Sequence, residues 1–355
     1  MSGFNNNFRG KRIGWLCSYV PEEIIIAAGL EPLRIQGQVE MCMEADSYMS
    51  LNHCPYLKNI LDSGLQNKFK NVEGIIFTSS CDGMRRLYDI WTHHVRMPFS
   101  YMLEIPKNKD EKAIRYFSEQ LYGLRTRLEE VFKTDISDGK LGKAITLLNE
   151  HRNVMIRLFE RQKESPSPYK GSELLALCLE EMTRPKDETT EKIKSFLERP
   201  PQPFKDKSPR ILVIGNVIDK FSLFQMVESV GGSVVAFDTC LGLRHYSGAV
   251  KEGPDPIETL ARRYLLKPLC ARMPGFNERI ERVEELIQDY SADGIVYSMM
   301  KFCDYGMFEA PIIERRLQNR RVPFLTLEND YVWRDEGRVK TRIEAFVEMI
   351  RGDLN

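Results

Sequence analysis

Apolar residues along this chain fall into two recurring patterns. Short and nearly continuous apolar runs, bounded by glycine or polar residues, are typical of strands buried on both faces of a parallel sheet. Such runs lie at 12–16, 33–36, 74–78, 97–103, 210–215, 233–237 and 322–327, and another begins at Gly294. Between them, apolar residues recur at intervals of three and four, which predicts amphipathic helices. The alternation of strands and helices implies parallel sheets covered by helices.

The middle of the chain follows the helical pattern alone. From residue 110 to about 194, no strand signal interrupts the three- and four-residue spacing. Three prolines within four positions then exclude a continuing helix and mark a linker. We therefore expect an α/β fold with two doubly wound parallel-sheet domains, at 1–109 and 210–355, with a helical insert at 110–199 and a linker at 200–209 between them.

Three cysteines stand next to predicted helix starts. Cys54 directly precedes Pro55, which suits the first position of a helix, and Cys81 precedes a helix predicted at 83–91. Cys303 repeats the second arrangement, because it also follows a strand and a short turn. A thiol at a helix N-terminus feels the positive end of the helix dipole, which favours the metal-binding thiolate. The spacing alone leaves metal ligands and buried packing thiols equally open, because no CxxC pair or zinc or ferredoxin spacing is present.

Composition narrows the possible partners. Lys plus Arg and Asp plus Glu each number 51 in the 355 residues, so no net charge favours nucleic acid or an anionic membrane surface. No apolar run approaches the roughly 18 residues of a membrane span, and residues 1–12 lack a hydrophobic signal core. We therefore expect a cytoplasmic protein whose partners are small molecules or proteins. Eight scattered cysteines in a reducing compartment favour metal or redox chemistry over disulfides.

Seven short segments give the chain a resemblance, almost end to end, to the subunits of the 2-hydroxyacyl-CoA dehydratase and benzoyl-CoA reductase family. In order, they are 14–32 (GWLCSYVPEEIIIAAGLEP), 53–55 (HCP), 79–91 (SSCDGMRRLYDIW), 238–246 (DTCLGLRHY), 255–264 (DPIETLARRY), 302–304 (FCD) and 341–348 (TRIEAFVE). The resemblance implies a [4Fe-4S] cluster held by Cys54, Cys81 and Cys303, with one iron open to a non-cysteine ligand.

The resemblance also implies a reaction and its partners. One low-potential electron would reduce an acyl-CoA thioester to a ketyl radical anion, which expels the 2-hydroxyl group, while the open iron binds the substrate oxygen. The electron would come from a separate ATP-hydrolysing activator with its own cluster, because this chain has neither a GxxxxGK[ST] loop nor a GxGxxG fingerprint. A homologous second subunit, or a second copy of this chain in a dimer, would complete an oxygen-sensitive enzyme.

Three residues near the expected ligands are candidates for catalysis. His53 adjoins Cys54, where its imidazole would hydrogen-bond a cluster sulfide or move a proton, or would cap a surface loop. Ser18 and Glu23 lie at a predicted strand-to-helix turn, where they would orient substrate or cap the helix.

Two alternatives to a single open cubane are considered. A related branch of the family holds a double-cubane cluster, reduces small molecules and uses further cysteines in the second domain, for which Cys240 and Cys270 are candidates. Arg272 stands where that branch tends to carry another cysteine, so we expect one cubane with Cys240 and Cys270 unligated. The second alternative is a non-catalytic, cluster-bearing partner subunit. The remaining cysteines have no motif support as ligands and are interpreted as packing residues: Cys17, Cys42 and Cys178.

Overall fold

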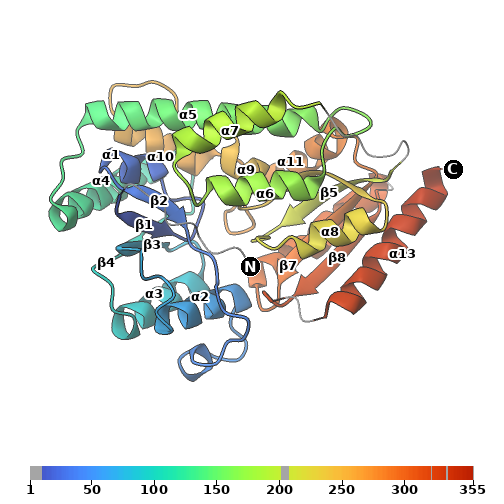
Figure 1. The fold of residues 1–355 in the computed structure, drawn as a ribbon, viewed down its shortest axis with the longest axis horizontal. Helices are drawn as coiled ribbons and strands as arrows, with labels where there is room; N and C mark the ends of the chain where they lie inside the picture. The colour runs from blue at the N-terminus through green and yellow to red at the C-terminus, as the bar shows by residue number, and fades with distance from the viewer. Residues whose placement is uncertain (1–9, 201–207, 321, 333–334, 355) are drawn as a thin grey trace.

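The computed structural model describes residues 10–200, 208–320, 322–332 and 335–354, so most of the expected linker lies outside the described residues. Within this part of the chain, the strands form two four-stranded sheets in which all neighbouring strands are parallel. Helices flank both sheets (Figure 1). The expected α/β fold with two parallel sheets is confirmed.

Both sheets have the same topology. The first has the order β2-β1-β3-β4, with β1 at Arg12–Trp15, β2 at Glu31–Arg34, β3 at Gly74–Thr78 and β4 at Phe99–Leu103. The second has the order β6-β5-β7-β8, with β5 at Arg210–Gly215, β6 at Ser233–Asp238, β7 at Gly294–Met300 and β8 at Phe324–Asn329. In each sheet the winding reverses beside the first strand. Ligands of such folds bind outside the carboxyl ends of the strands near this reversal.

Several of the predicted apolar runs form completely buried strands. Every residue of β3, β5 and β6 is buried, as expected for strands covered on both faces. The strand β2 begins earlier than the apolar run at 33–36, because it pairs with β1 from Glu31 opposite Arg12 to Arg34 opposite Trp15. Strand pairing, rather than apolarity, sets the limits of β2.

Helices connect the strands of the first sheet, and the close packing of two of them depends on a glycine. These helices are α1 at Glu22–Ala27, η1 at Ala45–Ser47, α2 at Pro55–Leu65 and α3 at Asp82–His94. Helices α2 and α3 lie side by side (Figure 1). A Cβ atom added to Gly64 would lie 2.4 Å from the ring of Trp91, so only glycine allows this approach.

The middle segment consists of four helices that contact both sheets. They are α4 at Glu111–Phe132, α5 at Asp138–Arg161, α6 at Gly171–Glu181 and α7 at Lys186–Leu197. Asp110 and Ser137 cap α4 and α5 by accepting hydrogen bonds from the backbone N–H groups of Ala113 and Lys140. Helix α4 packs against β4, whereas α6 packs against β6. Figure 1 shows α5 extending across both halves of the molecule.

The remaining helices lie between the strands of the second sheet and after its last strand. They are α8 at Ser222–Ser229, α9 at Leu243–Tyr246, α10 at Pro256–Leu266, α11 at Phe276–Asp289, α12 at Asp304–Leu317, η2 at Gln318–Arg320 and α13 at Glu336–Leu354. Among the described helices, none combines the length and the apolarity that crossing a membrane requires.

Candidate metal centre

Each of the three expected cysteine ligands occupies the N-cap position of a helix. Cys54 precedes α2, Cys81 precedes α3 and Cys303 precedes α12. Pro55 is the first residue of α2, as its position in the sequence predicts. Since β3 and β7 end shortly before Cys81 and Cys303, both thiols lie at the carboxyl ends of central strands. This is the edge where α/β folds bind ligands.

The three thiols share one electrostatic environment. Burial raises the pKa of the Cys54 thiol to about 12, and the neighbouring Cys303 and Cys81 contribute to the increase. The side-chain amide of Asn216 donates a hydrogen bond to the Cys303 sulfur at 3.2 Å, and Arg272 Nη2 lies 3.7 Å from the same sulfur. Two donors therefore face the Cys303 sulfur, and one of them, Arg272, is a cation.

Three further cysteines lie around the same arginine. The Cys240 N–H donates to the Asn216 carbonyl at 3.3 Å, which places Cys240 beside the asparagine that contacts Cys303. Burial alone would lower the pKa of Arg272, but neighbouring thiols, Cys270 and Cys240 among them, raise it well above its ordinary value. Six thiols therefore lie around Arg272, and each half of the chain contributes three of them. We call this set the six-cysteine group: Cys17, Cys54, Cys81, Cys240, Cys270 and Cys303.

Cys17 is the member that sequence reasoning assigned to packing. Burial raises the pKa of its thiol, but hydrogen bonds from the Tyr19 backbone and the Thr78 and Ser80 hydroxyls, together with the charge of Arg272, lower it overall. A signal for this placement exists in the sequence. Cys17 follows β1, which is the neighbour of β3 in the sheet, and the carboxyl ends of parallel neighbours lie at one edge.

The donor set consists of thiols, the ligand type of iron–sulfur clusters. In the described part of the chain, no three His, Cys, Asp or Glu side chains lie close enough together to hold one metal ion. The thiols of an iron–sulfur cluster bind different irons, so they stand farther apart than the ligands of one ion. Lys107 Nζ donates a hydrogen bond to the Arg272 carbonyl at 3.1 Å, so two cations lie beside these thiols. Thiols at helix N-termini next to two cations are chemically suited to an anionic cluster.

Comparison with known proteins assigns the chain to a family. Residues 17–350 match the family model described as 2-hydroxyglutaryl-CoA dehydratase, D-component. The chain belongs to this D-component family. The matched residues include the whole six-cysteine group, from Cys17 onwards.

The relatives of this chain are named after several different enzymes. It is 24% identical over 345 residues to the (R)-phenyllactyl-CoA dehydratase beta subunit of Clostridium sporogenes, which covers 96% of this chain and 92% of the relative. It is 24% identical to the beta subunit of (R)-2-hydroxyglutaryl-CoA dehydratase of Acidaminococcus fermentans, over 96% and 92%. It is 23% identical to one of the subunits of the benzoyl-CoA reductase of Thauera aromatica, over 90% and 85%.

His53 lies between two of the helix starts, at Cys54 and Cys81. Its ring stands beside Gly83 in the first turn of α3, where an added Cβ atom would lie 3.4 Å from His53 Nε2. Burial lowers the pKa of His53, which favours the neutral imidazole near pH 7. A role for His53 in proton transfer stays a prediction.

Glu23 lies in the first turn of α1, and Ser18 lies in the turn that precedes this helix. The carboxylate of Glu23 is fully buried, and its two oxygens receive Arg152 Nη2 and, at 2.8 Å, the hydroxyl of Tyr264. The backbone carbonyl of Ser18 accepts a hydrogen bond from Lys267 Nζ. The structure therefore places the Glu23 carboxylate inside a buried ion pair, and a substrate-orienting role for either residue stays a prediction.

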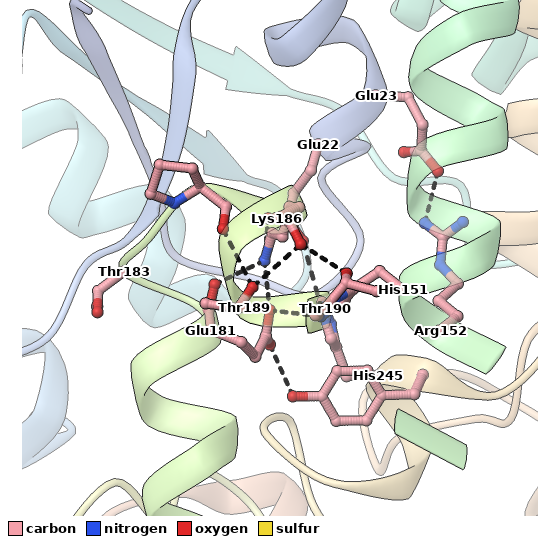
Figure 2. A network of polar contacts seen from close by, with 12 residues as sticks. Glu22, Glu23, His151, Arg152, Glu181, Thr183, Lys186, Thr189, Thr190 and His245 are labelled. Carbon is pink, nitrogen blue, oxygen red and sulfur yellow. Dashed lines mark hydrogen bonds and ion pairs between the residues drawn. The ribbon is translucent and has the colours of Figure 1, made fainter. Parts of the chain in front are cut away.

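Figure 2 shows a buried polar network that joins α1 to the middle helices and to α9. Lys186 Nζ lies 3.1 Å from Glu22 Oε2 and also binds Glu181. His151 Nε2 lies 3.0 Å from Glu181 Oε2, and His245 Nε2 lies 3.4 Å from Glu22 Oε1. We call these residues and the adjoining ion pair the charged network: Glu22, Glu23, His151, Arg152, Glu181, Lys186 and His245.

The electrostatics of the charged network follow from its pairing. Burial raises the pKa of Glu22, but Lys186 and His245 outweigh burial and lower it to about 2. The pKa of Glu181 is likewise lowered despite burial, chiefly by Lys186 and His151. Burial lowers the pKa of His245 to about 4, against the opposing effect of Glu22. Near pH 7 both carboxylates are therefore ionised and His245 is neutral.

Proposed function

We propose that this chain is the iron–sulfur subunit of a 2-hydroxyacyl-CoA dehydratase or of a related acyl-CoA reductase. In this proposal, Cys54, Cys81 and Cys303 hold a [4Fe-4S] cluster with one open iron. The observation that carries it is the position of all three thiols at helix N-termini, with Asn216 and Arg272 directed at Cys303. Membership of the D-component family, which includes dehydratase and reductase subunits among the relatives, supports the substrate class.

The bound cluster would supply one low-potential electron for reducing the acyl-CoA thioester to a ketyl radical anion, and a site for the substrate oxygen. The residues of the chain would serve that chemistry in distinct ways. Asn216 and Arg272 donate to the Cys303 sulfur and stabilise the charge on it. His53, whose burial favours the neutral form, would hold or move a proton beside Cys54.

Two protein partners complete the proposed enzyme. The relatives are named as single subunits of larger enzymes, which supports assembly with a homologous second subunit, or with a second copy of this chain. An ATP-hydrolysing activator with its own cluster would provide the electron, because this sequence contains no phosphate-binding loop of its own.

Iron content tests the proposal directly. Anaerobically purified chain is expected to contain about four irons, and Cys54→Ser, Cys81→Ser or Cys303→Ser should each abolish them, because two thiolates are too few to hold the cluster. Iron and sulfide analysis checks the count. Cys42→Ser is the matched control, since Cys42 is a half-buried cysteine outside the six-cysteine group, and it should leave iron unchanged. Full iron in the Cys81→Ser variant would overturn the proposal.

The second candidate function is a double-cubane reductase of small molecules. The observation that favours it is the position of Cys17, which raises the number of thiols around Arg272 to six, three from each half. Six thiolates would suffice for two cubanes joined by one sulfide. The same iron and sulfide analysis separates the two candidate functions. About eight irons per chain, with fewer in the Cys17→Ser variant, would support the double cubane. About four irons, unchanged in a Cys17→Ser/Cys240→Ser/Cys270→Ser variant, would support the single cubane.

A further inference from the structure

Arg34 is a buried cation whose donors are left unused. It ends β2 and is only 2% exposed, with its guanidinium 4.6 Å from the centre of the Trp15 ring. Neither Nη1 nor Nη2 donates a hydrogen bond to any described residue. Leaving charged donors buried without acceptors is strongly unfavourable, so folding alone gives no reason for this arrangement.

Arg244 shows how the same fold treats a buried arginine that serves structure. It is also 2% exposed, but its Nη2 donates to the carbonyls of Gly215 at 2.6 Å and Asp238 at 2.9 Å. Its Nη1 donates to the carbonyl of Leu269 at 3.5 Å. At equal burial, Arg244 joins three backbone segments through its terminal nitrogens and leaves its Nε unpaired, whereas both terminal nitrogens of Arg34 are without a partner among the described residues.

A matching acceptor comes from the other half of the chain. Asp219 lies in the loop between β5 and α8 and is 6% exposed. Its Oδ2 accepts a hydrogen bond from the Tyr331 hydroxyl at 2.6 Å, whereas its Oδ1 has no partner among the described residues. The same Tyr331 hydroxyl accepts a hydrogen bond from the Gly37 backbone N–H at 3.0 Å, so Asp219 lies beside the segment that follows Arg34. Tyr331 thus joins the segment that follows the unused donors of Arg34 to the unused acceptor of Asp219 in the other half of the chain.

The pair also adjoins the candidate metal centre. Arg34 is paired in the sheet with Trp15, two residues before Cys17, and Asp219 lies three residues after Asn216, whose side chain contacts Cys303. Arg34 stands at the carboxyl end of β2, and Asp219 follows the carboxyl end of β5, so both occupy the edges where parallel sheets bind ligands.

We propose that Arg34 and Asp219 form a subsite for the 2-hydroxyacyl group, in which the guanidinium binds the carbonyl oxygen and Asp219 Oδ1 accepts a hydrogen bond from the adjacent hydroxyl. The assignment rests on the proposed function for its substrate class. A 2-hydroxyacyl thioester carries an acceptor and a donor on neighbouring carbons, which is the pattern that completes this pair. A site built to bind a hydroxyl discriminates strongly against an analogue without one, because its polar groups are then left unpaired.

Calorimetric titration with two thioesters tests the subsite. Lactoyl-CoA and propionyl-CoA differ only by the 2-hydroxyl group, and the iron-free full-length chain excludes a cluster sulfide as the partner of Arg34. Lactoyl-CoA is expected to bind at least tenfold more tightly than propionyl-CoA. Arg34→Met should weaken both thioesters by about 10- to 100-fold, as expected for lost charge-assisted hydrogen bonds. Asp219→Ala should remove the preference for lactoyl-CoA.

Thermal unfolding without ligand separates binding from folding. Arg34→Met should leave the Tm unchanged or raise it, because it removes an unpaired buried cation, whereas Arg244→Met should lower it. Equal affinity for both thioesters, binding of neither, or a Tm loss in Arg34→Met as large as that in Arg244→Met would overturn the assignment. Iron content is measured separately from these affinities. An iron content other than about four per chain, together with tighter binding of lactoyl-CoA than of propionyl-CoA, would refute the proposed function and leave the subsite standing.

Discussion

The charged network and the Arg34–Asp219 pair are both buried and polar, but they differ in how completely their atoms are paired. Each carboxylate of the network has a cation beside it. Glu181, for example, contacts Lys186, His151 and the hydroxyl of Tyr246. Arg34 and Asp219 keep terminal atoms without partners among the described residues. In the network, Glu22 Oε2 and His245 Nδ1 make no hydrogen bond within the described chain, but every carboxylate is ion-paired, whereas no ion pair among the described residues involves Arg34 or Asp219.

This difference separates two uses of buried charge. An ion-paired buried network contributes little net stability compared with apolar packing, but it favours one arrangement of the elements that carry it, and losing one member is costly. The charged network joins α1 of the first half to α5, α6, α7 and α9 (Figure 2). An incompletely paired site is kept at a cost to stability and is therefore the better place to look for substrate.

The largest expected effect comes from breaking the paired region at its central cation. Lys186→Met removes the ammonium shared by Glu22 and Glu181 and leaves two buried carboxylates short of a partner. The free energy of unfolding should fall by about 3–5 kcal/mol. Urea denaturation followed by circular dichroism measures the change.

Lys192 provides the matched control on the same helix. It pairs with Glu180 but is half exposed, so Lys192→Met should lower the free energy of unfolding by at most about 1 kcal/mol. Similar losses in the two variants would show that burial does not set the cost of breaking these pairs.

An intermediate effect is expected from His245 and pH. Its folded pKa of about 4 lies below the ordinary histidine value, so the folded state binds fewer protons than the unfolded state between about pH 6.5 and 4. Stability from this group is complete above that window and is lost as the pH falls through it. Between pH 6.5 and 5 the loss should be about 1.5–2 kcal/mol. The contribution of Glu22, whose folded pKa is about 2, is lost only below about pH 4.5.

Urea denaturation across this pH range isolates the contribution of His245. His245→Gln cannot titrate and should flatten the decline between pH 6.5 and 5. His93→Gln, at an exposed position in the last turn of α3, removes a surface histidine and should keep the wild-type slope. An unchanged slope in His245→Gln would assign the decline to other groups.

Local signals predicted the elements and the main cysteine positions. Pro55 after Cys54, and a strand and turn before Cys81 and Cys303, suffice to place these thiols at helix starts, because capping depends on neighbouring residues. The helical segment was predicted as one region. Its first break, where Lys133 has a left-handed φ of 53°, depends on a single backbone position that periodicity does not reveal.

The partners of buried charges were not predictable in this way. Glu23 has the favourable place of an acid in the first turn of a helix, but its actual partner, Arg152, is 129 residues away. Arg34 reads as an ordinary strand residue, and only the assembled fold shows that its donors remain unused. Pairing of this kind depends on tertiary contacts, which a single sequence does not specify.

The smallest predicted effect concerns the free energy of unfolding that is lost when one buried polar atom has no hydrogen-bond partner. Thr190 and Thr189 are neighbours on α7, and each is 3% exposed. The Thr190 hydroxyl contacts His151 Nδ1 at 2.8 Å, whereas the Thr189 hydroxyl donates only to backbone carbonyls of its own helix. Thr190→Val should therefore lower the free energy of unfolding by about 1–2 kcal/mol, because it leaves a buried ring nitrogen without its partner.

Thr189→Val should lower it by less than about 0.5 kcal/mol, since the Pro185 carbonyl keeps the hydrogen bond from the Thr189 backbone N–H at 3.2 Å. Both substitutions preserve side-chain shape, so the difference between them reports the cost of orphaning one polar atom. Equal losses, measured by urea denaturation, would mean that this interior tolerates unpaired groups. The unused donors of Arg34 would then no longer indicate a ligand.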